Sequence, residues 1–287
     1  MSNKNLRNYF KKAEKEGWAI GHFNISNLET LKAIFQAAKN LKSPVIIGTS
    51  ESESGFLGMK QAAALVKSLR EENNFPIFLN LDHGKNFLYI KKAVDAGYDM
   101  VHFDGSSLPL KKNIKIAKKV VAYAKDKKVL VEGEVGVISG SSTILKKALK
   151  IRERDLTNPE EAEVFLKETK VNVLAVNVGT FHGMKASGKN PRIDLERLKE
   201  IKKKIGDTPL VLHGGSGTPK QDIKKAVKIG ISDIHINTEL RVAFTGSLRK
   251  VLKGGEIVPY KYMPEVIEKV QKIVEEKIKL FGSRNKI

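Results

Sequence analysis

The stretch Leu210-Val211-Leu212-His213-Gly214-Gly215-Ser216-Gly217-Thr218-Pro219 joins a run of branched apolar residues to a glycine turn and then to a helical pattern. Histidine is the commonest metal ligand among side chains. Glycines let backbone N–H groups approach an anion, and a helix N-terminus favours negative charge. The stretch therefore predicts a strand, a turn and a helix whose corner can hold a metal ion beside a phosphate. Because the same turn also occurs in proteins as a purely structural element, other parts of the chain are needed to show whether it forms a binding site here.

Apolar runs of strand length recur along the whole chain and alternate with helical patterns. Eight strands that alternate with helices predict a parallel α/β protein and favour a closed (β/α)8 TIM barrel over an open, doubly wound sheet. We expect one domain over residues 1–287, with an extra N-terminal helix at about residues 4–16 and a C-terminal helical extension over Pro264–Phe281. The expected strands are Trp18–Asn24, Pro44–Thr49, Pro76–Leu81, Met100–Asp104, Val129–Glu134, Val173–Val178, Pro209–His213 and Ile231–Asn237.

The composition limits the class of protein. The 287 residues are 41% hydrophobic, but no window of eighteen apolar residues occurs, which argues against a transmembrane helix. The first twenty residues lack the apolar region of a signal peptide, so we expect a cytoplasmic protein. The chain has no cysteine, so a transition-metal site must use histidine and carboxylates.

The formal net charge of +20 is large. It is compatible with binding to nucleic acid, or with a field that attracts phosphorylated substrates. The lysines are spread over many expected helices and no aromatic residues alternate with them. This pattern favours a solvated surface or an anionic small substrate over a nucleic-acid partner.

All six histidines lie on or at the end of expected strands, where a barrel places its active site. Three of them precede a glycine: His83, His182 and His213. Asp104 and Glu134 end two further strands. Three imidazoles with nearby carboxylates and one open position are the composition of a catalytic zinc site. For any one of these histidines taken alone, the alternative to metal binding is that its side chain only packs in the barrel wall.

Several short blocks, in order along the chain, resemble one known family. They are Phe23-Asn24-Ile25-Ser26-Asn27-Leu28-Glu29, Leu81-Asp82-His83-Gly84, Phe103-Asp104-Gly105-Ser106, Glu132-Gly133-Glu134-Val135-Gly136, Thr157-Asn158-Pro159-Glu160-Glu161-Ala162, Val178-Gly179-Thr180-Phe181-His182-Gly183, Leu212-His213-Gly214-Gly215-Ser216-Gly217 and Asn237-Thr238-Glu239-Leu240-Arg241. With them the chain resembles the class II, metal-dependent fructose-bisphosphate aldolases and the related tagatose-bisphosphate aldolases over nearly its whole length.

The resemblance implies zinc on His83, His182 and His213, with Asp104 and Glu134 at alternative or second metal positions for another divalent or a monovalent cation. It implies that Asp82 is the acid and base at the cleaved hydroxyl. The residues implied for the phosphate, the ketose end and the mouth are Gly183, Gly214, Gly215, Ser216, Asn237, Thr238, Ser50 and Asn24.

The implied reaction is the glycolytic cleavage of fructose 1,6-bisphosphate to dihydroxyacetone phosphate and glyceraldehyde 3-phosphate, and its reverse. Breaking a carbon–carbon bond beta to a ketone leaves an enediolate, which a divalent metal stabilises as a Lewis acid. The alternative, a Schiff-base lysine, needs a desolvated lysine, and no expected strand carries one beyond its first residue. Tagatose 1,6-bisphosphate or another ketose 1-phosphate is the alternative substrate, and the resemblance implies a homodimer or homotetramer.

The chain departs from the family pattern at three places. Serines replace the glutamate of the loop after the fifth strand, so Glu153 or another loop carboxylate is a candidate replacement. His235 replaces a substrate-binding asparagine, and the family's tyrosine before its phosphate-loop lysine is missing, which leaves Lys185 or Lys189 as candidates.

Two hypotheses follow from these departures. In the first, His235 and His22, on neighbouring strands, face the mouth and compensate as catalytic bases. The alternative is that His22, His102 and His235 only pack or hydrogen-bond in the wall. In the second, the barrel binds metal and phosphate but has lost aldolase turnover and acts as a sensor.

Overall fold

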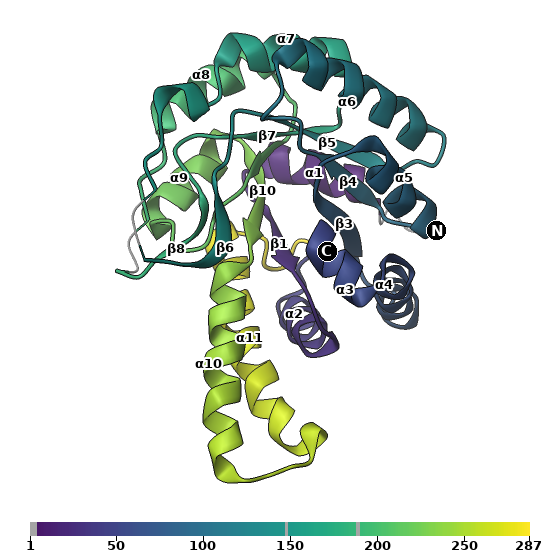
Figure 1. Cartoon of the computed structure of the whole chain (residues 1–287), viewed down its shortest axis with the longest axis vertical. Helices are drawn as coiled ribbons and strands as arrows, with labels where there is room; N and C mark the ends of the chain where they lie inside the picture. Colours follow the sequence, from purple (N-terminus) through teal and green to yellow (C-terminus); the bar gives the residue numbers. More distant parts are fainter. Residues whose placement is uncertain (1–4, 147–148, 188–189) are drawn as a thin grey trace.

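The computed structural model describes residues 5–146, 149–187 and 190–287, and within them parallel strands form a closed barrel (Figure 1). The order around the barrel is β1-β10-β9-β7-β5-β4-β3-β2, with β1 paired to β10. This closure confirms the TIM barrel and excludes the open sheet. The strands are β1 (Ile20–Asn24), β2 (Val45–Ser50), β3 (Ile77–Gly84), β4 (Met100–Phe103), β5 (Leu130–Val135), β7 (Val173–Val176), β9 (Leu210–Leu212) and β10 (Ile231–Ile236).

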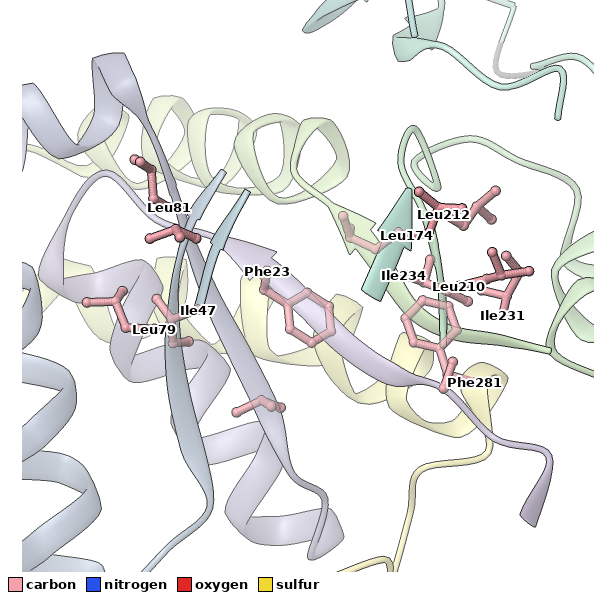
Figure 2. Close-up of a cluster of buried hydrophobic side chains, with 14 of the residues drawn as sticks. Phe23, Ile47, Leu79, Leu81, Leu174, Leu210, Leu212, Ile231, Ile234 and Phe281 are labelled. Carbon is pink, nitrogen blue, oxygen red and sulfur yellow. The ribbon is translucent and has the colours of Figure 1, made fainter. Parts of the chain in front are cut away.

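Helices surround the barrel, as Figure 1 shows. Outward-facing strand residues such as Phe23, Ile47 and Leu174 belong to the core that lies between strands and helices, and Figure 2 shows them with Phe281 of the last helix. The strands are therefore buried on both faces, which explains their continuous apolar runs. The surrounding helices are α2 (Leu28–Leu41), α4 (Met59–Asn73), α5 (Phe87–Ala96), α6 (Leu110–Lys125), α7 (Pro159–Thr169), α8 (Leu195–Ile205) and α9 (Lys220–Ile229).

The N-terminal helix α1 (Leu6–Glu16) closes one end of the barrel. Its Leu6, Tyr9 and Phe10 share an apolar cluster with residues at the start of the barrel strands, among them Ile20 and Phe78. Because this end is filled by apolar side chains, only the opposite end, where the strands finish, is free to carry polar chemistry.

Three features go beyond the predicted elements. A short helix α3 (Glu51–Leu57) follows β2, and a two-stranded sheet forms between β6 (Gly140–Leu145) and β8 (His182–Lys185). Helices α10 (Thr238–Val251) and α11 (Pro259–Phe281) pack together and extend away from the barrel (Figure 1). The C-terminal helix begins at Pro259 and not at Pro264, because Pro259 already occupies the favoured first position. Two 3-10 turns complete the chain, η1 (Glu153–Asp155) and η2 (Leu252–Gly254).

None of the helices described is long and apolar enough to cross a membrane.

Candidate active site

The barrel interior changes from apolar to polar along its axis. Alternate residues of a barrel strand face inward. The next inward side chain of a strand therefore lies two residues after the one that packs in the apolar cluster beside α1. Several inward side chains beyond the apolar layer are polar and fully buried, among them His22, Asn80, His102, Glu132 and Asp233. They form a layer that we call the buried polar layer. Above it, at the mouth, lie the ends of the strands with most of the predicted site residues.

A backbone irregularity in β3 brings two consecutive side chains to the mouth. His83 has a φ of +54°, and the pairing of β3 with β4 shifts register between Leu81 and Gly84. In a regular strand Asp82 and His83 would point to opposite faces. The left-handed residue and the bulge turn both side chains toward the axis, and such strain is typical of functional sites.

The three predicted metal-binding histidines meet at the mouth. The ring centre of His83 lies 4.6 Å from that of His182 and 4.5 Å from that of His213. On His83, Nδ1 is 2.8 Å from Asp104 Oδ2, and on His213, Nε2 is 2.8 Å from Glu132 Oε1. These bonds leave His83 Nε2 and His213 Nδ1 buried without a hydrogen-bond partner.

This arrangement fits a metal ion. A metal-binding histidine typically donates its other N–H to a carboxylate, which fixes the ring and leaves the second nitrogen for the metal. Burial lowers the pKa of His182 to about 3 and holds that of His213 well below its usual value. Both rings are therefore neutral at pH 7, which is the form that binds metal.

The two additional carboxylates have different surroundings. Asp104 accepts hydrogen bonds from Ser106 on Oδ1 and faces His83 and Lys85 with Oδ2, so both of its oxygens are engaged. Glu134 Oε2 makes no hydrogen bond of suitable geometry, and it lies 3.2 Å from His102 Nε2 and 3.7 Å from His83 Nδ1. Of the two, Glu134 is therefore the freer group, although both can join His83 in a three-residue metal cluster.

Asp82 lies at the centre of the mouth. Its Oδ2 accepts a hydrogen bond of 2.9 Å from Asn24, and its Oδ1 is 3.3 Å from His235 Nδ1 and 3.8 Å from His83 Nε2. Burial alone would raise the pKa of Asp82, but the His83 and His235 imidazoles outweigh it, and the pKa lies well below its usual value. Asp82 is therefore ionised at neutral pH.

The glycine turn after β9 meets the N-terminus of α10. Ser216 Oγ accepts the backbone N–H groups of Asn237 and Glu239 at 3.3 and 3.4 Å. The Asn237 side chain does not cap α10, because it donates to Glu53 Oε1. The positive end of a fourteen-residue helix therefore faces this corner, as expected for a phosphate site.

Most of the predicted residues line one pocket. Among the described residues that line it, Ser142 alone was not predicted from the sequence, and it comes from β6. The lining residues are Asn24, Asp82, Ser142, His182, Gly183, His213, Gly214, Ser216, His235, Asn237 and Thr238.

Other predicted residues lie outside this lining. The Gly215 N–H is bonded to His235 O, the Lys185 N–H to Asn190, and the Ser50 side chain caps α3. His22 faces inward but belongs to the buried polar layer rather than to the mouth, because it lies two residues before the end of β1. Lys189 is outside the described residues.

The loop after β5 carries no carboxylate to the pocket within its described residues. The Glu153 side chain is 79% exposed and pairs with Arg197, so the expectation that it replaces the missing glutamate is wrong for this conformation. The serine segment instead forms β6, which pairs with β8 and so holds Ser142 beside His182.

A buried carboxylate that the sequence analysis did not identify organises one side of the mouth. Glu53 accepts hydrogen bonds from Asn24, from Asn237 and from the Ser50 backbone, and it pairs with Arg241. The spacing of Ser50 and Glu53 is that of a capping box, which forms here and could have located Glu53. His102 hydrogen-bonds within the barrel wall, as one alternative expected: its Nδ1 accepts the His83 N–H at 3.2 Å, and this bond supports the bulge.

The comparison with protein families decides the class. The model of the family described as fructose-bisphosphate aldolase class-II matches residues 4–286. The chain belongs to this family. It is an aldolase, a lyase of a metal-dependent class whose substrates are small phosphorylated sugars.

Relatives of this aldolase act on more than one compound. It is 36% identical to the fructose-bisphosphate aldolase of Helicobacter pylori, with 96% of this chain and 97% of the relative covered. It is 39% identical to the 6-phospho-5-dehydro-2-deoxy-D-gluconate aldolase of Shouchella clausii, with 96% and 92% covered. The same activity is named for a relative from Bacillus velezensis, which is 38% identical over 98% of this chain and 96% of its own length.

Solved structures agree with the fold. The YdjI aldolase from Escherichia coli K12 has a TM-score of 0.84 at 29% identity, with 98% of both chains covered. A putative fructose-1,6-biphosphate aldolase from Coccidioides immitis has a TM-score of 0.86 at 27% identity, with 100% of this chain and 99% of that one covered.

Proposed function

We propose that this aldolase cleaves fructose 1,6-bisphosphate to dihydroxyacetone phosphate and glyceraldehyde 3-phosphate, and catalyses the reverse condensation, with zinc as its metal. The observation that carries the proposal is the joint lining of one pocket by metal-binding nitrogens, an ionised carboxylate and a helix N-terminus. Together these groups match a ketone, the hydroxyl that loses its proton and a phosphate.

The zinc ligands in this proposal are His83, His182 and His213. The support is the pair of buried nitrogens without partners, His83 Nε2 and His213 Nδ1, each on a ring whose other nitrogen faces a carboxylate. A bound zinc ion would supply Lewis-acid stabilisation of the negative charge that develops on the ketone oxygen. Asp104 holds the His83 ring in place, and Glu134 offers an alternative ligand.

Asp82 is the proposed base in cleavage. Its ionised carboxylate accepts the proton of the hydroxyl on the carbon whose bond breaks, and returns it in condensation. Asn24 orients it through the bond to Oδ2. His235 joins the catalytic set because its Nδ1 lies close to Asp82 Oδ1, where it can hold or exchange that proton.

The proposed phosphate site uses the turn after β9, the start of α10 and Gly183. Gly183, Gly214 and Gly217 have φ between +68° and +108°, a backbone conformation that favours glycine, and Gly214 and Gly183 line the pocket. Ser216 and Thr238 add hydroxyl groups at the same corner.

A second candidate substrate differs from fructose 1,6-bisphosphate at the end opposite the ketone. The substrates for which these relatives are named both have a phosphate beside a ketone, whereas the other end is a phosphate in one and a carboxylate in the other. On this aldolase the cationic group beside Asn24 is Arg241, which is paired with the buried Glu53. Because the pair offers less free positive charge to a second phosphate, another ketose 1-phosphate is the second candidate.

A coupled assay of dihydroxyacetone phosphate release tests both candidates. Fructose 1,6-bisphosphate, tagatose 1,6-bisphosphate and fructose 1-phosphate are compared at equal concentrations, with inactive Asp82→Ala protein as the background. The proposal predicts the highest kcat/KM for fructose 1,6-bisphosphate. Higher kcat/KM for fructose 1-phosphate supports the second candidate, and binding of all three without release shows that the barrel has lost turnover.

A further inference from the structure

Two residues of the buried polar layer, His22 and Asp233, lie against His235 at the floor of the mouth, and the proposed reaction uses only His235 of the three. His22 on β1 and His235 on β10 are direct partners in the register of these two strands, and Asp233 lies two residues before His235. His22 and Asp233 are fully buried and His235 is 5% exposed. We propose that His22, Asp233 and His235 form a second metal site, beneath the mouth, for a divalent transition metal ion such as zinc.

The separations of the three donor atoms suit a metal. Asp233 Oδ2 lies 3.1 Å from His22 Nδ1 and 3.8 Å from His235 Nε2, and one donor atom from each residue falls within 4.8 Å of the others. Two ligands of a tetrahedral zinc ion, with bonds of about 2.0–2.1 Å, stand about 3.3 Å apart. The observed separations lie on either side of that value. Two imidazoles with one carboxylate also favour a transition metal over magnesium or calcium.

His22 Nδ1 and Asp233 Oδ2 share a hydrogen bond of 3.1 Å, but the other side-chain polar atoms of Asp233 and His235 have no hydrogen-bond partner among the described residues. These atoms, Asp233 Oδ1 and both nitrogens of His235, are buried. His235 faces a carboxylate on each side, Asp82 near Nδ1 and Asp233 near Nε2. A neutral imidazole has one N–H, so it can donate to only one of these two carboxyl groups. A cation between Nε2 and Asp233 removes this conflict and leaves Nδ1–H for Asp82.

The same construction occurs at the mouth. On His213 one nitrogen contacts the Glu132 carboxylate and the other has no partner, and on His83 one nitrogen contacts Asp104. His235, with Nδ1 toward Asp82 and Nε2 toward Asp233, repeats this pattern one step deeper in the barrel. A metal-binding ring with a carboxylate on its far nitrogen is the usual arrangement of metal-binding histidine.

Packing of the rings also favours a neutral pair that binds metal. The ring centres of His22 and His235 are 3.6 Å apart, and that of His213 lies 3.8 Å from His235. Imidazolium rings this close would repel each other in a buried layer. Gly48 maintains the space, because a Cβ at this position would lie 2.9 Å from His22 Nε2. With no exposed face at His22 or Asp233, the ion would be structural, and it would hold His235 against Asp82.

A zinc count tests the proposal. The protein is stripped with a chelator, loaded with excess zinc chloride, freed of unbound zinc by gel filtration and analysed by mass spectrometry of the metal. We expect Asp233→Asn to lose one zinc equivalent relative to the wild type. Asp222→Asn is the matched control and should retain the wild-type count. Asp222 lies on the outer helix α9, is as buried as Asp233, and accepts a hydrogen bond from Arg192.

A second variant separates the two sites. His182→Ala should lose the zinc at the mouth and keep the deeper one, so that its double variant with Asp233→Asn binds neither. If Asp233 is instead a protonated acid that donates to His22, asparagine replaces it without effect on zinc content. An unchanged count in Asp233→Asn overturns the proposal, as does a wild type that binds a single equivalent. His22→Gln, expected to lose the same equivalent, gives the answer if Asp233→Asn does not fold.

Discussion

Replacing Gly214 with alanine should damage both the fold and the metal site. Gly214 has a φ of +68°, and a Cβ at this position would lie 2.3 Å from Phe181 O and 2.8 Å from Phe181 C. The left-handed conformation costs alanine about 1–2 kcal/mol. Pushing the backbone of Phe181 away adds about 1–3 kcal/mol, by analogy with overpacked cores. The next residue is His182, so the displacement should also weaken zinc binding.

Gly17 provides a matched control for the conformational part of this loss. It has a φ of +67° at the end of α1, and nothing lies within 4 Å of a Cβ placed there. Gly17→Ala should therefore cost about 1–2 kcal/mol and leave zinc affinity unchanged. Urea unfolding of the metal-free proteins gives the two free energies, and competition with a zinc indicator gives the affinities. If Gly214→Ala is as stable as Gly17→Ala and has the same zinc affinity, the close contact of Gly214 with Phe181 contributes neither to stability nor to zinc binding, and the prediction is refuted.

Three further predictions concern single carboxylates. Asp82→Asn should lower kcat by about 10²–10⁴-fold with little change in zinc content, because it removes the proton acceptor; an unchanged kcat would exclude Asp82 as the base. Asp104→Asn should weaken zinc binding at the mouth by about 10–100-fold, since the His83 ring loses its carboxylate partner, and competition with a chelator measures this; equal affinity would contradict the role. Asp222→Asn tests a pH dependence: the bond from Arg192 holds the pKa of Asp222 below its usual value of 3.8, so this contribution is complete above pH 4 and is lost as the pH falls through the lower folded value. The stability difference from wild type, about 1–2 kcal/mol at pH 7, should decrease as the pH falls below 3.8, and a difference that stays constant through the acid range would refute the assignment.

The sequence allowed the barrel and the core of the site to be predicted because both depend on local patterns. Apolar runs of strand length located all eight barrel strands. The position of His83, His182 and His213 before glycines, at strand ends, predicted their meeting, since parallel barrel strands finish at one mouth.

What the sequence could not predict depends on contacts between distant segments. The pairing of β6 with β8 joins residues about forty positions apart, and it turns an expected loop into a strand that carries Ser142. The His83 bulge and the alignment of His22 with His235 arise only when the barrel closes. Glu53 was overlooked because its partners lie on two other segments: Asn24 ends β1, and Asn237 and Arg241 belong to the start of α10.

The central claim is that metal held by His83, His182 and His213 enables this chain to cleave a phosphorylated ketose. Its most direct test is the rate of dihydroxyacetone phosphate release from fructose 1,6-bisphosphate by chelated protein before and after one zinc ion per mouth site is restored. We predict that chelation abolishes release, that zinc restores it, and that zinc restores nothing in His83→Ala. Full activity of the chelated protein, or full activity of His83→Ala, would contradict the account.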